Sequence, residues 1–245
     1  MPERGNDLTK RVLALQQVWD DPPGYLGELM EEHSIAYDTI EVEKEPLPVL
    51  HAYDALLVLG GPQHAPAEDR FPYLAQEKAL IREAVAQEMP FLGMCLGGQL
   101  LAHAFGAPVT RHHLTEIGFY RVEFTEEGRA DPLLQGLPGY QQVIHWHEDT
   151  FDIPPRGVLL ATNPYTRNQA FRLGRNAYGL QYHIELTPEM LHTWLHYPDY
   201  RKEIVKAMGA EAPDLIEEAA QTAYPLYREH TRILFENFLR IANLT

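Results

Sequence analysis

The feature that most restricts the fold of this chain is a short apolar run that ends in glycines around the only cysteine. The stretch PFLGMCLGGQLLAHAFGA, residues 90–107, has Gly93 and Gly97 two positions either side of Cys95. A tight strand-to-helix turn needs small residues at these positions, because the chain folds back against itself there. The pattern predicts a buried strand, a sharp turn that carries the thiol, and a helix.

Apolar runs alternate with helical patterns before this turn. Runs typical of strands occupy residues 11–18, 35–42, 54–61 and 90–94, and amphipathic patterns predict helices over 25–32 and 74–88. Strands that alternate with helices usually pair in parallel, and helices then cover both faces of the sheet. We therefore predict an α/β fold with a mostly parallel central sheet, and with its chemistry at the carboxyl edge of the strands.

The pattern changes after residue 119. Short strand-like runs at 119–124, 141–147, 157–162, 169–174 and 177–183 predict hairpins, and so a small antiparallel portion of the sheet. The preceding TRHH segment, residues 110–113, has no motif around it and is expected to be a solvated loop. Thr187 and Pro188 suit an N-cap and a first helical position, and helices are expected from there on.

The length of 245 residues fits one large domain. We expect a main domain over residues 1–190 and a helical extension over residues 191–245 that packs on it. The extension carries an apolar stripe, with Pro225 early in its helix; the stripe comprises Leu226, Tyr227, Ile233, Leu234, Phe238 and Ile241. Packing against the main domain is the first interpretation of the stripe, and a homodimer or partner surface is the second.

Charge and cysteine content restrict the partners. Twenty lysines and arginines stand against 35 acidic residues, and a net charge of −15 argues against binding to nucleic acid or to an anionic membrane surface. One cysteine forms no internal disulfide, and the N-terminal segment is a poor signal peptide. No apolar run approaches the ~20 residues that cross a bilayer. We expect a cytoplasmic protein whose ligand is small or is another protein.

The setting of Cys95 favours nucleophilic chemistry. A thiol at the start of a helix faces free N–H groups and the positive end of the helix dipole, both of which favour thiolate. The N–H of Leu96, just past the cysteine, is well placed to bind an oxyanion. The alternative is a buried free cysteine that acts as a small apolar residue, which is common.

A base and an orienting carboxylate are available in GLQYHIELTPEM, residues 179–190. His183 and Glu185 are two positions apart, so on an extended strand they share a face. The carboxylate then approaches the imidazole while the ring faces the thiol. Cys95, His183 and Glu185 therefore form a candidate catalytic triad.

These residues resemble the class I, triad-type glutamine amidotransferases. GMCLGGQ matches their G-x-C-x-G-x-Q signature, HIE matches their H-x-E, and LLVLGGPQHA is similar to their glycine-rich oxyanion strand and loop. The resemblance covers about residues 11–190 and is closest to the amidotransferase domain of GMP synthase and its free-standing relatives. It implies a flavodoxin-like α/β fold.

The resemblance also implies roles for single residues. Cys95 is the nucleophile, His183 the general acid and base, and Glu185 the group that orients His183. The backbone N–H of Gly61 joins that of Leu96 in the oxyanion hole. Two residues are expected to bind substrate: Gln99 in the motif, and His147 in VIHWHEDTFDIP.

The implied reaction is hydrolysis of the side-chain amide of glutamine through a γ-glutamyl thioester, with no cofactor and no metal. The alternating imidazoles of His145 and His147, followed by Glu148 and Asp149, could suggest a metal site on a strand. No third ligand is signalled at the spacing of a metal-binding motif. The S-G-G-x-D-S loop of the ATP pyrophosphatase segment of GMP synthase does not occur. The ammonia acceptor is therefore expected on a partner synthetase.

Two other functions stay open at this point. A self-contained hydrolase of γ-glutamyl amides or peptides would use the same triad and the same first half-reaction. A non-catalytic binding module would keep the fold and use the C-terminal helices for contact. Activity of the isolated chain separates these possibilities.

Overall fold

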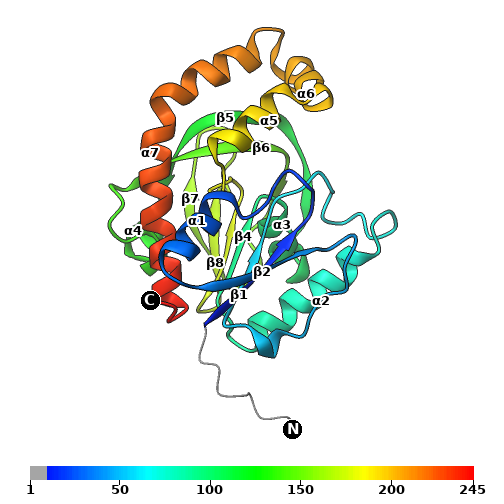
Figure 1. Cartoon of the computed structure of the whole chain (residues 1–245), viewed down its shortest axis with the longest axis vertical. Helices are drawn as coiled ribbons and strands as arrows, with labels where there is room; N and C mark the ends of the chain where they lie inside the picture. The colour runs from blue at the N-terminus through cyan, green and yellow to red at the C-terminus, as the bar shows by residue number, and fades with distance from the viewer. Residues whose placement is uncertain (1–9) are drawn as a thin grey trace.

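A nine-stranded mixed sheet organises the computed structural model, which describes residues 10–245 (Figure 1). The strand order is β2-β1-β3-β4-β9-β8-β7-β5-β6. The predicted α/β fold is confirmed. The N-terminal residues 1–9, on which part of the signal-peptide argument depends, lie outside the described residues.

The first five strands in this order form the parallel half of the sheet. They are β2 (Ala36–Glu41), β1 (Arg11–Gln16), β3 (Ala55–Val58), β4 (Phe91–Met94) and β9 (Ala177–Leu180). Val12 and Ala14 of β1 enter one apolar cluster, whereas Leu13 and Leu15 enter another. This alternation places apolar side chains on both faces, so both faces must be covered.

Helices cover the two faces. α1 (Gly24–Glu32) shares the first cluster with the C-terminal helix, and α2 (Tyr73–Ala86) and α3 (Leu96–Ala104) share the second. The remaining short elements are α4 (Glu126–Ala130) and two 3-10 turns, η1 (Leu50–Ala52) and η2 (Pro132–Leu134). The sheet edge at the end of β4 stays accessible between these layers, and the Cys95 turn lies there.

The antiparallel half is larger than the sequence suggests. It contains β8 (Ala170–Leu173), β7 (Gly157–Thr162), β5 (Val109–Phe124) and β6 (Tyr140–Phe151). β5 and β6 pair from Val109↔Phe151 to Glu123↔Tyr140, with a register shift between Arg111 and Glu116. The expectation of a loop at residues 110–113 is wrong, because these polar residues lie on the exposed part of this ribbon.

Three helices follow residue 187: α5 (Pro188–His196), α6 (Pro198–Met208) and α7 (Ala212–Ile241). The predicted cap is confirmed, since Thr187 Oγ1 accepts a hydrogen bond from the N–H of Met190 at 3.2 Å. α7 begins thirteen residues before Pro225, so the expectation that this proline lies early in its helix is wrong. The missing proline N–H is tolerated inside a long, packed helix.

The C-terminal helices are attached to the sheet. α5 and α6 lie over one end of it, and α7 runs down beside it (Figure 1). Leu234 and Phe238 of the predicted stripe are fully buried in the same cluster as β1 and α1. The packing interpretation of the stripe therefore holds, while a domain division at residue 190 stays a prediction. Within residues 10–245, no helix is both long and apolar enough to cross a bilayer.

Candidate active site

Cys95 occupies a strained turn between β4 and α3. Its backbone has φ +47° and ψ −106°, a conformation that costs a non-glycine residue free energy and that clusters at functional sites. A Cβ atom at Gly97 would lie 2.1 Å from the carbonyl oxygen of Val58, and one at Gly93 would lie 2.5 Å from the carbonyl carbon of Gly97. Both glycines are therefore required for the turn, as the sequence predicts.

The turn holds the thiol near the surface of a cavity. Only 5% of Cys95 is exposed, and its N–H donates to the carbonyl of Leu180 at 2.9 Å. Its Sγ lies 3.7 Å from the carbonyl oxygen of Trp146. α3 begins at the next residue, so the positive end of its dipole lies at the sulfur.

His183 and Glu185 follow the end of β9. The N–H of His183 donates to the carbonyl of Ile144 on β6 at 2.9 Å, which fixes this segment beside the antiparallel ribbon. His183 Nδ1 lies 2.5 Å from Glu185 Oε1, and the N–H of Ile184 donates to Glu185 Oε2 at 2.7 Å. The predicted imidazole–carboxylate pair is present, although β9 itself ends earlier, at Leu180.

Charge stabilises an imidazolium at this position. Burial disfavours it, but the charges of Glu185 and Cys95 and the hydrogen bonds to both residues together raise the pKa of His183 well above its usual value. Burial would raise the pKa of Glu185, yet the charge and hydrogen bond of His183 lower it. The ring thus contacts the carboxylate through Nδ1, which leaves Nε2 for the thiol.

The two predicted oxyanion donors are adjacent. Gly61 follows β3, and a Cβ atom built on it would lie 3.2 Å from Leu96 Cδ2. Gly61 borders the cavity, and Leu96 is the first residue of α3. The two residues are therefore neighbours beside Cys95, and the use of their N–H groups for an oxyanion stays a prediction.

The predicted substrate-binding residues also border the cavity, but they differ in what they offer. Gln99 lies on α3, one turn after Cys95. His147 Nδ1 donates to the carbonyl of Asp149 at 2.9 Å, and its Nε2 lies 3.2 Å from Glu116 Oε2. Both nitrogens of His147 thus face protein atoms, so a contact with substrate through this ring stays a prediction.

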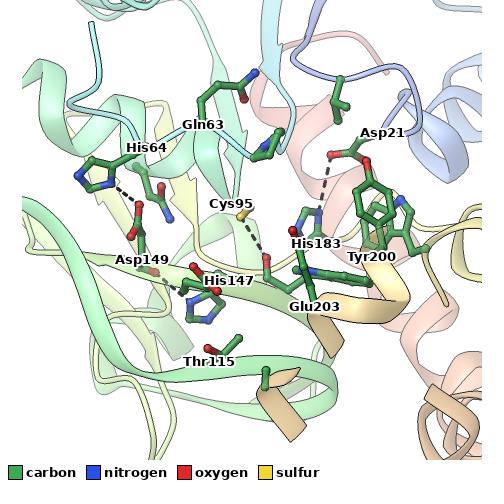
Figure 2. A pocket seen from close by; sticks show the side chains of 18 of the residues that line it. Asp21, Gln63, His64, Cys95, Thr115, His147, Asp149, His183, Tyr200 and Glu203 are labelled. Carbon is green, nitrogen blue, oxygen red and sulfur yellow. Dashed lines mark hydrogen bonds and ion pairs between the residues drawn. The ribbon is translucent and has the colours of Figure 1, made fainter. Parts of the chain in front are cut away.

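The cavity has a volume of about 500 Å³. Figure 2 shows Cys95 near its centre, with His183 and Asp21 on one side and His147 and Asp149 on the other. The residues that border it come from segments far apart in the sequence, and they include Asp20, Asp21, Gly61, Gln63, His64, Cys95, Gln99, Arg111, Trp146, His147, Asp149, His183, Trp194, Tyr200 and Glu203. Leu96 and Glu185 lie behind this surface.

Several of these residues were not identified from the sequence. Arg111 pairs with Glu148, and its Nε lies 3.9 Å from Asp149 Oδ1, while His64 Nδ1 bonds the other oxygen of Asp149. The Trp194 ring lies 5.1 Å from the His183 ring. Asp149 and His64 lie in segments that the sequence analysis singled out, VIHWHEDTFDIP and LLVLGGPQHA. Arg111 and Trp194 had no such signal and reach the cavity through tertiary packing.

Three groups of side chains have the spacing of metal ligands among the described residues: Glu116, His145 and His147; His192, His196 and Glu217; and Asp21, His183 and Glu185. The carboxylate of Glu116 already accepts hydrogen bonds from Asn163 at 2.7 Å and from Thr166. The third group is engaged in the His183–Glu185 hydrogen bond. We therefore interpret the third group as a proton-transfer site.

The α/β fold and the thiol, imidazole and carboxylate at its sheet edge restrict the class of protein, and comparison with known proteins identifies the family. The model of the glutamine amidotransferase class-I family matches residues 27–195, so the chain belongs to that family. The glutamine amidotransferase-like protein YfeJ of Salmonella typhimurium is 29% identical over 194 residues, which is 78% of this chain and 77% of YfeJ. The glutamine-hydrolysing GMP synthase component of Saccharolobus solfataricus is 31% identical over 61% of this chain and 74% of its own.

Solved structures agree with this assignment. A glutamine amidotransferase of Thermotoga maritima superimposes with a TM-score of 0.85 at 32% identity, over 94% of this chain and 98% of that one. A glutamine amidotransferase of Methylobacillus flagellatus gives 0.82 at 29% identity, over 95% of both chains. The similarity includes the C-terminal helices, because it extends over nearly the whole chain.

Proposed function

We propose that this protein is a cysteine hydrolase that cleaves the side-chain amide of glutamine to glutamate and ammonia. Cys95 is the nucleophile, His183 the general acid and base, and Glu185 the residue that orients His183. One observation carries the proposal: the Cys95 thiol on its strained turn borders the same cavity as His183, whose Nδ1 meets a buried carboxylate. Triads are recognised by this geometry.

In the acylation step, the Cys95 thiolate attacks the carbonyl carbon of the carboxamide. The carbon–nitrogen bond breaks, and the His183 imidazolium donates its proton to the departing ammonia. A γ-glutamyl thioester remains on Cys95. Glu185 holds Nδ1 protonated, so that Nε2 exchanges the proton that moves in this step.

In the deacylation step, neutral His183 removes a proton from a water molecule, which attacks the thioester. The carbon–sulfur bond breaks, glutamate leaves and the thiolate returns. The backbone N–H groups of Leu96 and Gly61 bind the oxyanion in both steps, and Gln99 and His147 contact the amino acid end of the substrate. Neither step requires a metal or a nucleotide.

The ammonia acceptor is proposed to lie on a partner synthetase. The Saccharolobus solfataricus relative is named as one subunit of GMP synthase, which supports an acceptor on a separate polypeptide. The isolated chain would then turn over glutamine slowly until the partner binds.

A second candidate is a self-contained hydrolase of γ-glutamyl amides. The cavity of about 500 Å³ has room for more than a carboxamide. Its wall beyond His183 is aromatic, because Trp146 contacts Trp194 and Tyr200 edge-on at ring distances of 5.7 and 5.8 Å. This wall suits an organic leaving group.

Glutamate release by the isolated protein tests both candidates. Wild type and Cys95→Ser are assayed side by side on glutamine, γ-glutamyl dipeptides and γ-glutamyl alkylamides. Faster Cys95-dependent cleavage of the larger amides supports the self-contained hydrolase. Slow turnover, together with labelling of Cys95 by a glutamine-like electrophile, supports the partner-activated amidotransferase. Absence of both turnover and labelling contradicts the triad and leaves the binding module.

A further inference from the structure

A second carboxyl group lies beside His183. Asp21 belongs to the segment between β1 and α1, and its side chain is 3% exposed. Its Oδ2 lies 4.0 Å from His183 Nδ1, and its Oδ1 has no hydrogen-bond partner. Asp21 borders the substrate cavity, whereas Glu185 does not. Of the two carboxyl groups near the imidazole, Asp21 is therefore the one that faces the reaction.

The surrounding structure holds Asp21 in this position. The N–H of Tyr25 donates to the carbonyl of Glu185 at 2.8 Å, which joins the start of α1 to the triad segment. Trp194 Nε1 donates to the carbonyl of Asp20 at 3.1 Å, and the Tyr200 hydroxyl donates to Asp20 Oδ1 at 3.1 Å. The loop is thus anchored on both sides of Asp21 by residues distant in sequence.

Gly60 shows how closely the two side chains approach the backbone. A Cβ atom at this position would lie 2.5 Å from His183 Cε1 and 2.7 Å from Asp21 Oδ2. Only a glycine leaves room for both groups here. The end of β3 therefore packs directly on the His183–Asp21 pair.

Charge balance determines the state of this cluster. One oxygen of Asp21, one of Glu185 and a His183 ring nitrogen lie within 4.8 Å of one another. Two buried carboxylates at this separation do not both ionise readily. Glu185 has the hydrogen bonds that stabilise an anion, while burial and the charge of Glu185 raise the pKa of Asp21 well above its usual value.

No lysine or arginine within residues 10–245 forms an ion pair with Asp21. The ionisable groups that face it are Glu185, His183 and Asp20.

We propose that Asp21 is a positioning residue of the catalytic centre: a second carboxyl group that lies beside His183 and, when ionised, stabilises its imidazolium. The proposal rests on the proposed function, because it concerns the imidazolium that protonates the leaving group. An ionised Asp21 stabilises this imidazolium, so His183 keeps its proton to higher pH than Glu185 alone would allow. Asp21 therefore widens the alkaline side of the active pH range.

The test compares Asp21→Asn with Glu185→Gln, using Glu189→Gln, an exposed position on α5, as a control for loss of a carboxyl group. The pH profile of kcat/KM for glutamine is measured for each. Asp21→Asn should stay within about tenfold of wild type at neutral pH, whereas Glu185→Gln should lose about 100-fold or more. The alkaline limb of Asp21→Asn should move to lower pH by about one unit or more. Glu189→Gln should keep the wild-type limb.

A readout independent of turnover accompanies the kinetics. The imidazole ¹⁵N signals of His183 are titrated in wild type and Asp21→Asn, and the variant should lose the imidazolium proton at lower pH. An unshifted titration, or a loss of activity in Asp21→Asn as large as in Glu185→Gln, overturns the proposal. If Asp21→Asn does not fold, Asp21→Ser takes its place. If neither folds, the wild-type titration decides, and a single ionisation step there refutes the role of Asp21.

The same experiments separate this inference from the proposed function. If wild type shows no turnover, no labelling of Cys95 and no thioester, the triad is contradicted, whatever the effect of Asp21. If wild type turns over glutamine and the pH profile of Asp21→Asn is unshifted, only the inference about Asp21 is contradicted. Cys95 alkylation is a clean signal, because the chain contains no other thiol.

Discussion

Replacing Glu185 with glutamine should expose how the triad controls the tautomer of His183. The fully buried carboxylate accepts hydrogen bonds from His183 Nδ1 at 2.5 Å and from the N–H of Ile184 at 2.7 Å. A glutamine of the same shape has one acceptor oxygen and one donor NH₂. If its oxygen accepts from Ile184, its NH₂ faces Nδ1 and forces the ring proton onto Nε2. His183 then no longer accepts the thiol proton.

The size of the effect follows from this geometry. General acid–base catalysis contributes about 100- to 10,000-fold, or about 3 to 5 kcal/mol at 1.36 kcal/mol per factor of ten. The pKa of His183 should also fall, because the charge of Glu185 is the largest of the effects that oppose its burial. Both changes act in the same direction, toward a neutral imidazole and a protonated thiol.

The assay is kcat/KM for glutamine, with the rate of Cys95 alkylation measured across pH on the same samples. Glu189→Gln, an exposed position on α5, is the matched control for the chemical change. Alkylation of Glu185→Gln at neutral pH should be slower than in wild type and in Glu189→Gln. A Glu185→Gln variant with wild-type kcat/KM and alkylation rate would falsify the tautomer argument.

Two further predictions concern stability. Gly97→Ala brings a Cβ atom to 2.1 Å from a backbone carbonyl and should cost about 3 kcal/mol or more. Gly106→Ala, with nothing within 4 Å and φ +85°, should cost only its backbone strain of about 1 to 2 kcal/mol. Urea midpoints that are equal, or reversed in order, would contradict the steric account of the turn. Burial raises the pKa of Glu77 from 4.5 to about 8. Between these two pH values the folded state holds a proton that the unfolded state has released. The free energy of unfolding of wild type should therefore fall relative to that of Glu77→Gln as the pH rises through this interval. Thermal unfolding at both ends of the interval checks this, and a constant difference between the two proteins would refute the shift.

Local sequence patterns predicted a large part of this fold and of the candidate site. The alternation of apolar runs with helical patterns predicted the parallel strands, because period and burial are properties of short segments. The glycines around Cys95 predicted the turn, since only a small side chain fits two residues either side of it. His183 and Glu185 are two residues apart, so they lie close together although the strand itself ends at Leu180.

Errors in the sequence analysis occurred where local patterns are ambiguous. The segment at 110–113 is polar because its strand belongs to an exposed ribbon, so alternation did not distinguish it from a loop. Pro225 normally ends or begins a helix, yet α7 continues through it, since packing against the sheet outweighs one missing hydrogen bond. Tertiary contacts decided both cases.

The cavity was decided by tertiary structure. Asp21 and His183 are 162 residues apart, and they meet because β1 and β9 lie on either side of β3 and β4 in one parallel sheet, whose strand ends share an edge. Trp194 and Tyr200 reach the same edge from helices that follow the sheet. No periodicity or spacing encodes these approaches. Sequence patterns fix the shape of each segment, whereas the order of strands and the packing of helices fix which segments meet.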